Sequence, residues 1–144
     1  MTINIVCDDE PVLDKFGRRV SLCSGISRLL KKRKSVQDNV EEIYDRVRAL
    51  LGMSDVHDKD LKIRVYKDKP SLHEAFFNIY YRPTNLRAWY IFEYHTIYVS
   101  ADDLNAGMLA HEMAHVIVDS YFGVKPPIES SEILARYVDT HLYD

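Results

Sequence analysis

A chain of 144 residues that is 47% hydrophobic and 28% charged has the length and composition of one folded domain, which excludes a disordered protein. Its net charge of −3 gives no attraction to nucleic acid or to an anionic membrane, so neither is expected as a partner. The two cysteines, Cys7 and Cys23, are too few for a disulfide framework, and Asp8 and Asp9 interrupt any apolar signal-peptide core. We therefore expect a cytoplasmic protein, with its oligomeric state left open.

The first 34 residues are expected to form a strand-rich N-terminal extension. Alternating apolar residues predict short strands at 2–8 and 18–23, which together indicate a hairpin. The residues between them are rich in turn formers and fit a loop or a single helical turn. A short helical or linking piece follows at 24–34, and its basic run indicates a solvated face more simply than a partner-binding patch.

The main domain is predicted to occupy residues 35–144. Ser35 can cap a helix, with Asp38 at the capping-box position, and Gly52 provides the stop at its other end. The helix has an apolar stripe with helical spacing. This stripe consists of Val36, Val40, Ile43, Val47, Leu50 and Leu51.

A strand, a short helix and a hairpin are predicted next. Alternating apolar residues predict the strand at 61–67, and Pro70 suits the first turn of the amphipathic helix that follows. The β-rich segments 86–94 and 96–100 are separated only by His95, so an antiparallel hairpin is their simplest arrangement.

A strongly apolar helix is predicted at 102–122. Residues 100–103 offer capping side chains and early acids, and Gly123 provides a C-terminal stop. Apolar residues lie on almost every side of this helix, which indicates that it is largely buried. A proline-containing loop follows, and Ser130 or Ser131 is expected to cap a final helix.

The buried helix contains His111, Glu112 and His115 in the spacing H-E-x-x-H. Residues four apart lie on one face of a helix, so the two histidines can bind one metal ion. Glu112 lies about 100° round the helix from His111, where it can reach a water on that metal as general base. A single buried histidine is usually a satisfied core residue, but two at this spacing with a glutamate between them favour a metal site.

A catalytic zinc site takes three protein ligands and leaves the fourth position to water, so a third ligand is needed. The pattern H-E-x-x-H-x-x-G-x-x-H is excluded, because the chain has Val118 and Tyr121 at the positions of its glycine and third histidine. Asp119 lies too far along the same helix to complete the coordination. Of the next acids, Glu129 and Glu132, the second is the better candidate because it begins a helix that can fold back across the metal.

This combination of strand hairpin, H-E-x-x-H helix and later glutamate resembles the gluzincin metallopeptidases, and the short chain looks most like the minigluzincins. It is also similar to the metallopeptidase domain of the ImmA/IrrE group. The resemblance covers about residues 36–143. It implies an α+β, zincin-like domain in which a short antiparallel or mixed sheet packs on the active-site helix and a C-terminal glutamate helix, with Glu132 as third zinc ligand.

The sequence departs from the gluzincin pattern in one place. Many gluzincins have an aspartate four residues after the ligand glutamate, where it orients the first histidine, but this chain has Arg136. Asp139 or Asp119 could take that supporting role.

We therefore expect a zinc-dependent endopeptidase that hydrolyses a peptide or protein. Zinc would acidify a bound water, and Glu112 would accept its proton and pass it to the leaving amine. Tyr121, Tyr137 and His141 are the candidates for a donor to the oxyanion. A strand within 87–94 could pair with an extended substrate.

Three alternatives stay open. The protein could be a regulatory metallopeptidase-like protein that recognises or cleaves one protein partner, with little general proteolysis. It could instead be a structural metal-binding domain, although an intact Glu112 disfavours a closed site without a general base. Cys7 could also reach the zinc and make residues 1–34 a latency segment, whereas the simpler prediction places both cysteines as small apolar residues in the hairpin.

Overall fold

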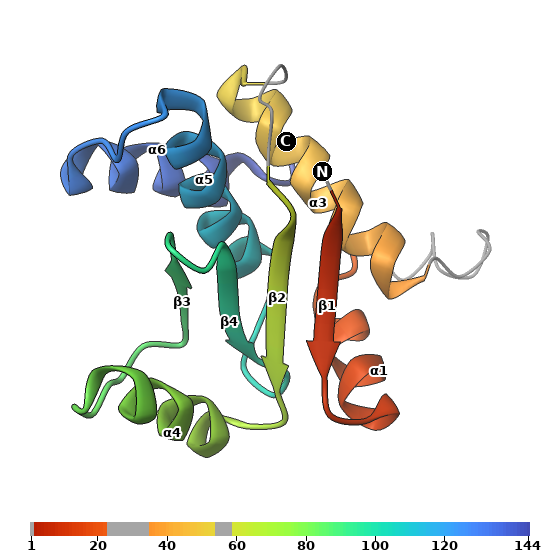
Figure 1. Cartoon of the computed structure of the whole chain (residues 1–144). Coiled ribbons are helices and arrows are strands. Elements are labelled where there is room, and N and C mark those ends of the chain that lie inside the picture. The colour runs from red at the N-terminus through yellow and green to blue at the C-terminus, as the bar shows by residue number, and fades with distance from the viewer. Residues whose placement is uncertain (1, 23–34, 54–58) are drawn as a thin grey trace.

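The computed structural model describes residues 2–22, 35–53 and 59–144, which form helices around a sheet (Figure 1). The elements in chain order are β1 (Ile3–Cys7), α1 (Glu10–Arg19), α3 (Val36–Leu51), β2 (Leu61–Tyr66), α4 (Lys69–Tyr80), β3 (Ala88–Ile91), β4 (Thr96–Ser100), α5 (Ala106–Phe122) and α6 (Ile128–His141). The described residues contain no helix long and apolar enough to cross a membrane.

The four strands form one mixed sheet in the order β1-β2-β4-β3. β1 pairs in parallel with β2, and β2 pairs in parallel with β4. β3 runs antiparallel to β4, with Tyr90 opposite Ile97, so the hairpin predicted for 86–100 is confirmed. His95 in its turn has a φ of 48°. Helices and a mixed sheet in one small domain confirm the predicted α+β class.

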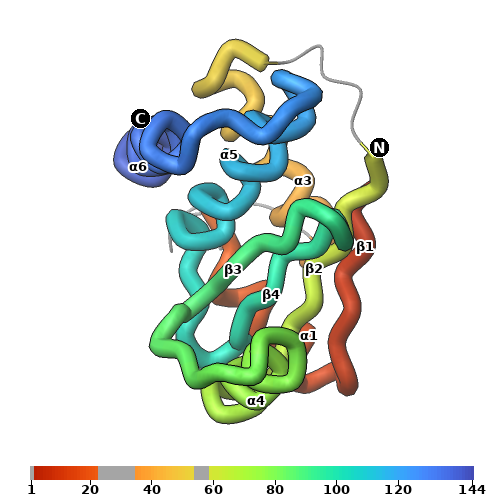
Figure 2. The backbone as a smooth tube through the Cα atoms, turned by 60° about the vertical axis from the view of Figure 1, so that its left-hand side comes forward, coloured from red at the N-terminus to blue at the C-terminus, as the bar shows by residue number. Residues whose placement is uncertain are grey.

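The two faces of the sheet are covered by different helices. Ile97 and Val99 of β4 point to one face, where they join the main core with α1, α3 and α5. Tyr98 points to the other face, where a smaller cluster gathers around Leu72 and Phe76 of α4. This follows from the two-residue period of side chains along a strand. Figure 2 shows α4 at one end of the sheet and α6 at the other.

The hairpin predicted for the N-terminal segment is wrong. Residues 10–19 form helix α1, and Val20, expected in a strand at 18–23, is its C-terminal cap. The side chain of Asp9 accepts a hydrogen bond from the Val12 amide at 3.0 Å, and a proline occupies the first turn. This cap and proline were the stronger signal, because two alternating residues are too few to define a strand.

The described part of the N-terminal segment belongs to the same sheet and core as the rest of the chain. β1 pairs with β2 along its whole length, from Ile3 opposite Leu61 to Cys7 opposite Val65. Phe16 of α1 is fully buried in the main core. The predicted boundary at residue 34 and the linking piece at 24–34 lie outside the described residues.

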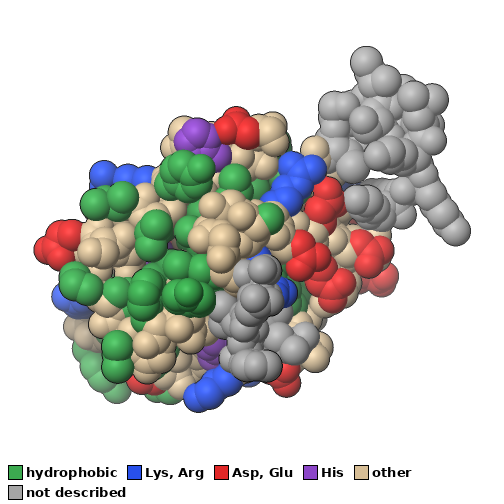
Figure 3. Space-filling model, turned by 90° about the horizontal axis from the view of Figure 1, so that it is seen from above, with side chains coloured by type: hydrophobic (Ala, Val, Ile, Leu, Met, Phe, Trp, Pro, Cys, Tyr) green, Lys and Arg blue, Asp and Glu red, His purple; other side chains and the backbone are tan. Residues whose placement is uncertain are grey.

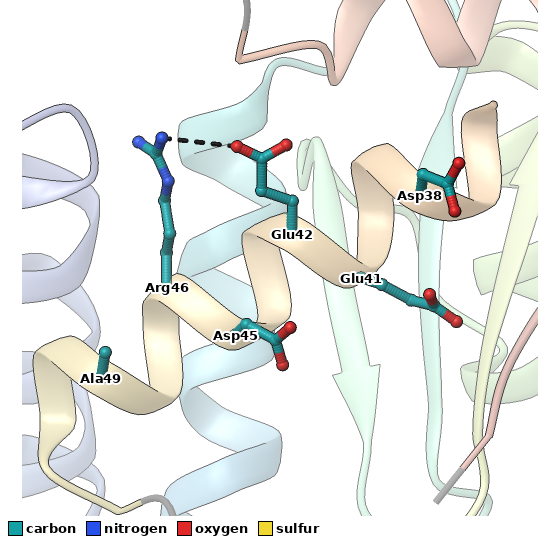
Figure 4. A pocket seen from close by; sticks show the side chains of 6 residues that line it. All are labelled: Asp38, Glu41, Glu42, Asp45, Arg46 and Ala49. Carbon is teal, nitrogen blue, oxygen red and sulfur yellow. Dashed lines mark hydrogen bonds and ion pairs between the residues drawn. The ribbon is translucent and has the colours of Figure 1, made fainter. Parts of the chain in front are cut away.

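Helix α3 agrees with its prediction at both ends. The Ser35 hydroxyl accepts a hydrogen bond from the Asp38 amide at 3.1 Å, and Gly52 ends the helix with a φ of 66°. Its outer face is acidic and solvent-exposed, with one ion pair of 3.4 Å between Glu42 and Arg46 (Figure 4).

Helix α5 begins later than predicted. Its cap is Asn105, whose side chain accepts from the Met108 amide at 2.8 Å, whereas the helix was expected to start near residue 102. The acids before the helix do not cap it. Asp103, for example, forms an ion pair of 2.7 Å with the Arg87 guanidinium. The predicted stop at Gly123 is confirmed by its φ of 68°.

Helix α6 begins at Ile128, so the caps predicted at Ser130 and Ser131 are wrong. The backbone amides of these two serines instead bond the carbonyl of Pro127 within the first turn. Two of its apolar residues, Ile133 and Tyr137, are 68% and 48% exposed. The residues that pack inward are Ser131, Ala135, Val138 and Leu142.

Candidate metal centre

Helix α5 holds the two histidines of the motif in a largely apolar setting. The residues around them, such as Met113, Ala114 and Val116, are fully buried. His111 and His115 are only partly buried, and their rings lie 5.1 Å apart at an angle of 66°. Their shared helical face therefore opens toward a neighbouring element instead of into the core.

That neighbouring element is α6, which packs against α5 and brings Glu132 to the histidines. The Nε2 atom of His115 lies 2.9 Å from Oε1 of Glu132, and the Nε2 atom of His111 lies 3.4 Å from Oε2. Helix α6 can approach this closely because its inward stripe is made of small residues at Ser131 and Ala135. The structure thus brings together the three residues predicted as ligands.

The three side chains fit a divalent metal ion. One ligand atom from each lies within 4.8 Å of the others. In tetrahedral coordination with bonds of about 2.0–2.2 Å, neighbouring ligand atoms lie about 3.3–3.5 Å apart. The separation of 3.4 Å between His111 and Oε2 of Glu132 matches this value, and the separation of 2.9 Å between His115 and Oε1 is shorter. Two imidazoles and a carboxylate suit zinc and also other transition metals, so the geometry supports a metal site without naming the ion.

Burial favours the ligating form of His115. Removal from water is the main cause that lowers the pKa of this imidazole, and the neighbouring His111 lowers it further, while the Glu132 carboxylate acts in the opposite direction. A lowered pKa keeps the ring neutral near pH 7. The neutral imidazole is the form that binds a metal through its nitrogen lone pair.

Glu112 lies beside the three candidate ligands and has an unusual acidity. Burial raises the pKa of its carboxyl to about 7, and the negative charge of Glu132 adds to this effect. A carboxylate with a pKa near the working pH is well suited to take up and release a proton. Glu112 also lines the same cavity as His115 and Glu132.

This cavity, of about 250 Å³, lies between β3, α5 and the start of α6. Its polar residues come mainly from α5 and α6, whereas its apolar wall comes from β3 and the loop before α6. Among the described residues, the lining consists of Leu86, Ala88, Trp89, Tyr90, Phe92, Glu112, His115, Asp119, Lys125, Pro126, Ile128, Ser131 and Glu132.

The three predicted oxyanion donors do not line the cavity. Tyr121 is 53% exposed beside Phe122, and Tyr137 packs against the ring of His141 at 4.4 Å on α6. The polar groups that line it, and that the sequence reasoning missed, are those of Tyr90 and Lys125. The sequence pattern that could have indicated Tyr90 is the two-residue period of β3, which turns its side chain toward α5. For Lys125 it is the position directly before the two prolines.

Tyr90 is a neutral hydrogen-bonding group in this cavity. Its hydroxyl lies 3.4 Å from Nδ1 of His95. Burial raises the pKa of this phenol, and the negative charge of Asp119 raises it further. The hydroxyl therefore keeps its proton at neutral pH and can donate it in a hydrogen bond.

The two aspartates considered for supporting roles have different surroundings. Asp119 is 4% exposed and lines the cavity. Asp139 is exposed on α6 and lies against Gly107, where a Cβ atom would be 2.6 Å from its Oδ1.

Cys7 is separate from the candidate metal ligands, which among the described residues are His111, His115 and Glu132. It lies at the end of β1, where its thiol donates to the Asp9 carbonyl at 3.4 Å, and burial raises the pKa of this thiol. The described structure thus gives no support to zinc ligation by Cys7. Cys23 lies outside the described residues.

Exposed apolar side chains surround the α5–α6 end of the molecule. Val124, Ile128 and Ile133 are each about 70% exposed, at 73%, 71% and 68%. Figure 3 shows hydrophobic side chains gathered on this side and carboxylates on the side of α3. An apolar surface beside a polar cavity is typical of a binding site for peptide or protein.

Comparisons of the chain with family models, with curated proteins and with solved structures give no match. Function is therefore inferred from the chemistry of the site alone.

Proposed function

We propose that this protein is a zinc-dependent metallopeptidase of the gluzincin type that acts in the cytoplasm. The observation that carries the proposal is the convergence of His111, His115 and Glu132, with Glu112 lining the same cavity as His115 and Glu132. Three protein ligands and an open side leave room for a water and a substrate, as catalytic zinc sites require. A site closed by a fourth protein ligand would have no use for a buried general base.

Each residue has a distinct task in this proposal. His111, His115 and Glu132 hold the metal, which when bound supplies a Lewis acid that lowers the pKa of water and polarises a peptide carbonyl. Glu112 accepts the proton of the attacking water and passes it to the leaving amine. Burial raises the pKa of its carboxyl in the metal-free chain, which makes this group a better proton acceptor than an exposed glutamate.

Tyr90 is the best-placed donor for the developing oxyanion. It lies on β3, lines the cavity and keeps its proton because burial raises the pKa of its hydroxyl. A donor that is already oriented stabilises negative charge more than water does. This assignment replaces the three donors considered from sequence, which lie outside the cavity lining.

The strand β3 supports the binding of an extended peptide. It is one of the two edge strands of the described sheet, and it pairs with β4 on one side. Residues 88–90 of the strand line the cavity. An extended substrate could add to this edge by main-chain hydrogen bonds and present its scissile bond to the metal.

The test is metal analysis joined to peptide cleavage. The purified chain is loaded with zinc, dialysed and incubated with a mixed peptide library, with and without chelator. We expect one zinc per chain and cleavage that chelator stops and zinc restores. Zinc binding without cleavage of any peptide would contradict a general peptidase, and failure to bind zinc would contradict the whole proposal.

The exposed apolar surface favours a second candidate, a regulatory protein that cleaves or recognises a single partner. Val124, Ile128 and Ile133 offer a docking area that a small peptide would not need. Such a protein would bind zinc and leave the library intact, yet would still depend on its apolar surface to bind a folded partner. A variant with Ile128 and Ile133 both replaced by Ser would then lose the partner and keep the metal.

A further inference from the structure

Asp119 is a buried carboxylate that the metal-site chemistry does not use. Its side chain lies on α5 one turn beyond His115, and the residue is only 4% exposed. Among the described residues, no hydrogen bond or ion pair joins its carboxylate to another group, and the carboxylate oxygens are not fully enclosed. What remains exposed faces the cavity beside the candidate metal centre.

The surroundings of Asp119 have the form of a side-chain pocket. Leu86, Pro126 and Ile128 contribute apolar walls to the same cavity, which has a volume of about 250 Å³. Because the residue is only 4% exposed, its carboxylate keeps little contact with water, and a charged group in that position is costly unless it is paired. Proteins rarely keep such a group unless a ligand or partner satisfies it.

We propose that Asp119 binds a positively charged group of the substrate, either a Lys or Arg side chain or a free α-amine, beside the scissile bond. This inference rests on the proposed peptidase function and names the class of substrate for it. An ammonium or guanidinium supplies both the positive charge and the hydrogen-bond donors that this carboxylate lacks. The apolar walls suit the methylene stem of such a residue.

Lys125 is the competing cation in this pocket. It lines the same cavity and its positive charge acts on Asp119, opposing the effect of burial on the pKa of that carboxyl. Its side chain is exposed on the loop before α6, and no ion pair joins it to Asp119 within 4.0 Å among the described residues. Removing this charge should strengthen the binding of a cationic substrate group.

The test measures binding and not turnover. Zinc-loaded Glu112→Gln protein is titrated into alanine-based hexapeptides that carry a fluorophore at the C-terminus, and anisotropy is recorded. One position at a time holds Lys, Arg or the uncharged isostere norleucine, and each peptide is made with a free and an acetylated N-terminus. These arms separate a side-chain cation from an α-amine.

We expect the peptides that carry the recognised cation to bind at least about tenfold more tightly than the matching uncharged peptides. A charge-assisted hydrogen bond in a buried site provides an effect of this size. In the same background, Asp119→Asn should bring this ratio close to one, and Lys125→Met should increase it. Asp139→Asn is the matched control and should leave the ratio unchanged. Equal binding of charged and uncharged peptides, or a ratio that survives Asp119→Asn, would overturn the inference.

Failure here can be told apart from failure of the proposed function. If the wild-type protein cleaves peptides but Asp119→Asn has the same preference, the peptidase stands and the role of Asp119 falls. If cationic peptides bind with the expected ratio and nothing is cleaved, Asp119 binds cations in a protein that is not a peptidase. If Asp119→Asn does not fold, Lys125→Met and the norleucine peptides still decide the question.

Discussion

The carboxylates of α3 and those of the cavity are chemically alike and lie in opposite environments. Helix α3 carries Asp38, Glu41 and Asp45 on a solvent-exposed face, with Glu42 paired to Arg46 (Figure 4). In the cavity, by contrast, burial raises the pKa values of Glu112 and Asp119. The exposed acids are charged and hydrated, which keeps the outer face of the helix soluble. The acids of the cavity hold their protons to higher pH.

This contrast shows why charge count alone does not locate a site. α3 has an apolar stripe and a polar face, so its acids stay in contact with water. α5 is apolar on nearly all sides, so each ionisable group on it costs free energy unless it is neutral, paired or metal-bound. An acid in the second setting therefore indicates function far more strongly than several acids in the first.

The largest expected effect comes from replacing the buried base. Glu112→Gln should lower peptide cleavage by roughly 10²–10⁴-fold while zinc binding stays stoichiometric, because a general base contributes about that much and the amide cannot accept the proton. Initial rates on the best library peptide and zinc analysis measure both. The control is Glu42→Gln on α3, which should keep full activity; equal loss in both variants would remove the distinction between the two sets of acids.

The next effect concerns the metal. Glu132→Ala should weaken zinc binding by at least about 100-fold, since loss of a direct ligand exceeds the roughly 10–100-fold cost of losing an outer-shell partner. Competition with a fluorescent zinc chelator measures the affinity. Glu129→Ala, three residues earlier on the exposed side of the same helix, should leave the affinity unchanged, and a loss there would argue against Glu132 as the ligand.

A third effect is on stability and has a defined sign with pH. The pKa of Glu112 is about 7 in the folded chain against an ordinary 4.5, so between these values the folded state binds more protons than the unfolded state. The stabilisation is present below pH 4.5 and is lost as pH rises through 7. In metal-free protein, wild type should therefore lose about 2 kcal/mol more stability than Glu112→Gln between pH 5 and pH 8. Urea unfolding at both values tests this, and parallel pH curves for the two proteins would contradict it.

The smallest effect is expected on α3. Glu42→Gln removes the partner of Arg46 in a 3.4 Å pair that is open to solvent. The loss should be at most about 0.5 kcal/mol and should vanish at high salt, because exposed pairs four residues apart contribute little. A loss near that of a buried group, measured by urea unfolding at low salt, would show that this acid is not simply solvated.

Elements with complete local signals were predictable from sequence. Ser35 and Gly52 bound α3 as expected, and the hairpin at 88–100 follows from its β-rich composition. The errors arose where weak signals competed. The alternation at Val20 and Leu22 predicted a strand, although Asp9 caps a helix there. The acids at 102–103 predicted a helix start, although Asp103 accepts a hydrogen bond from Arg87 and Asp102 accepts one from Ser100.

The site divides in the same way. His111, Glu112 and His115 are fixed by spacing along one helix, so the sequence alone places them together. The place of Glu132 depends on how α6 folds back, and the structure brings its carboxylate close enough to His111 and His115 for the three to bind one metal ion. Tyr90 and Asp119 could not be found in advance, because their importance comes from a cavity between elements whose packing no local pattern describes.

The position of β1 has a further consequence, for the order in which the chain folds. Among the described residues, those that line the cavity all lie between 86 and 132. β1 instead joins β2 across a sequence separation of 58 residues, as the hydrogen bond from the Thr2 amide to Asp60 shows. Such a long loop is costly to close, so the contact order of the N-terminal strand is much higher than that of the site. Amide hydrogen exchange should then detect openings of β1 and α1 that leave the protection of β4 and α5 intact.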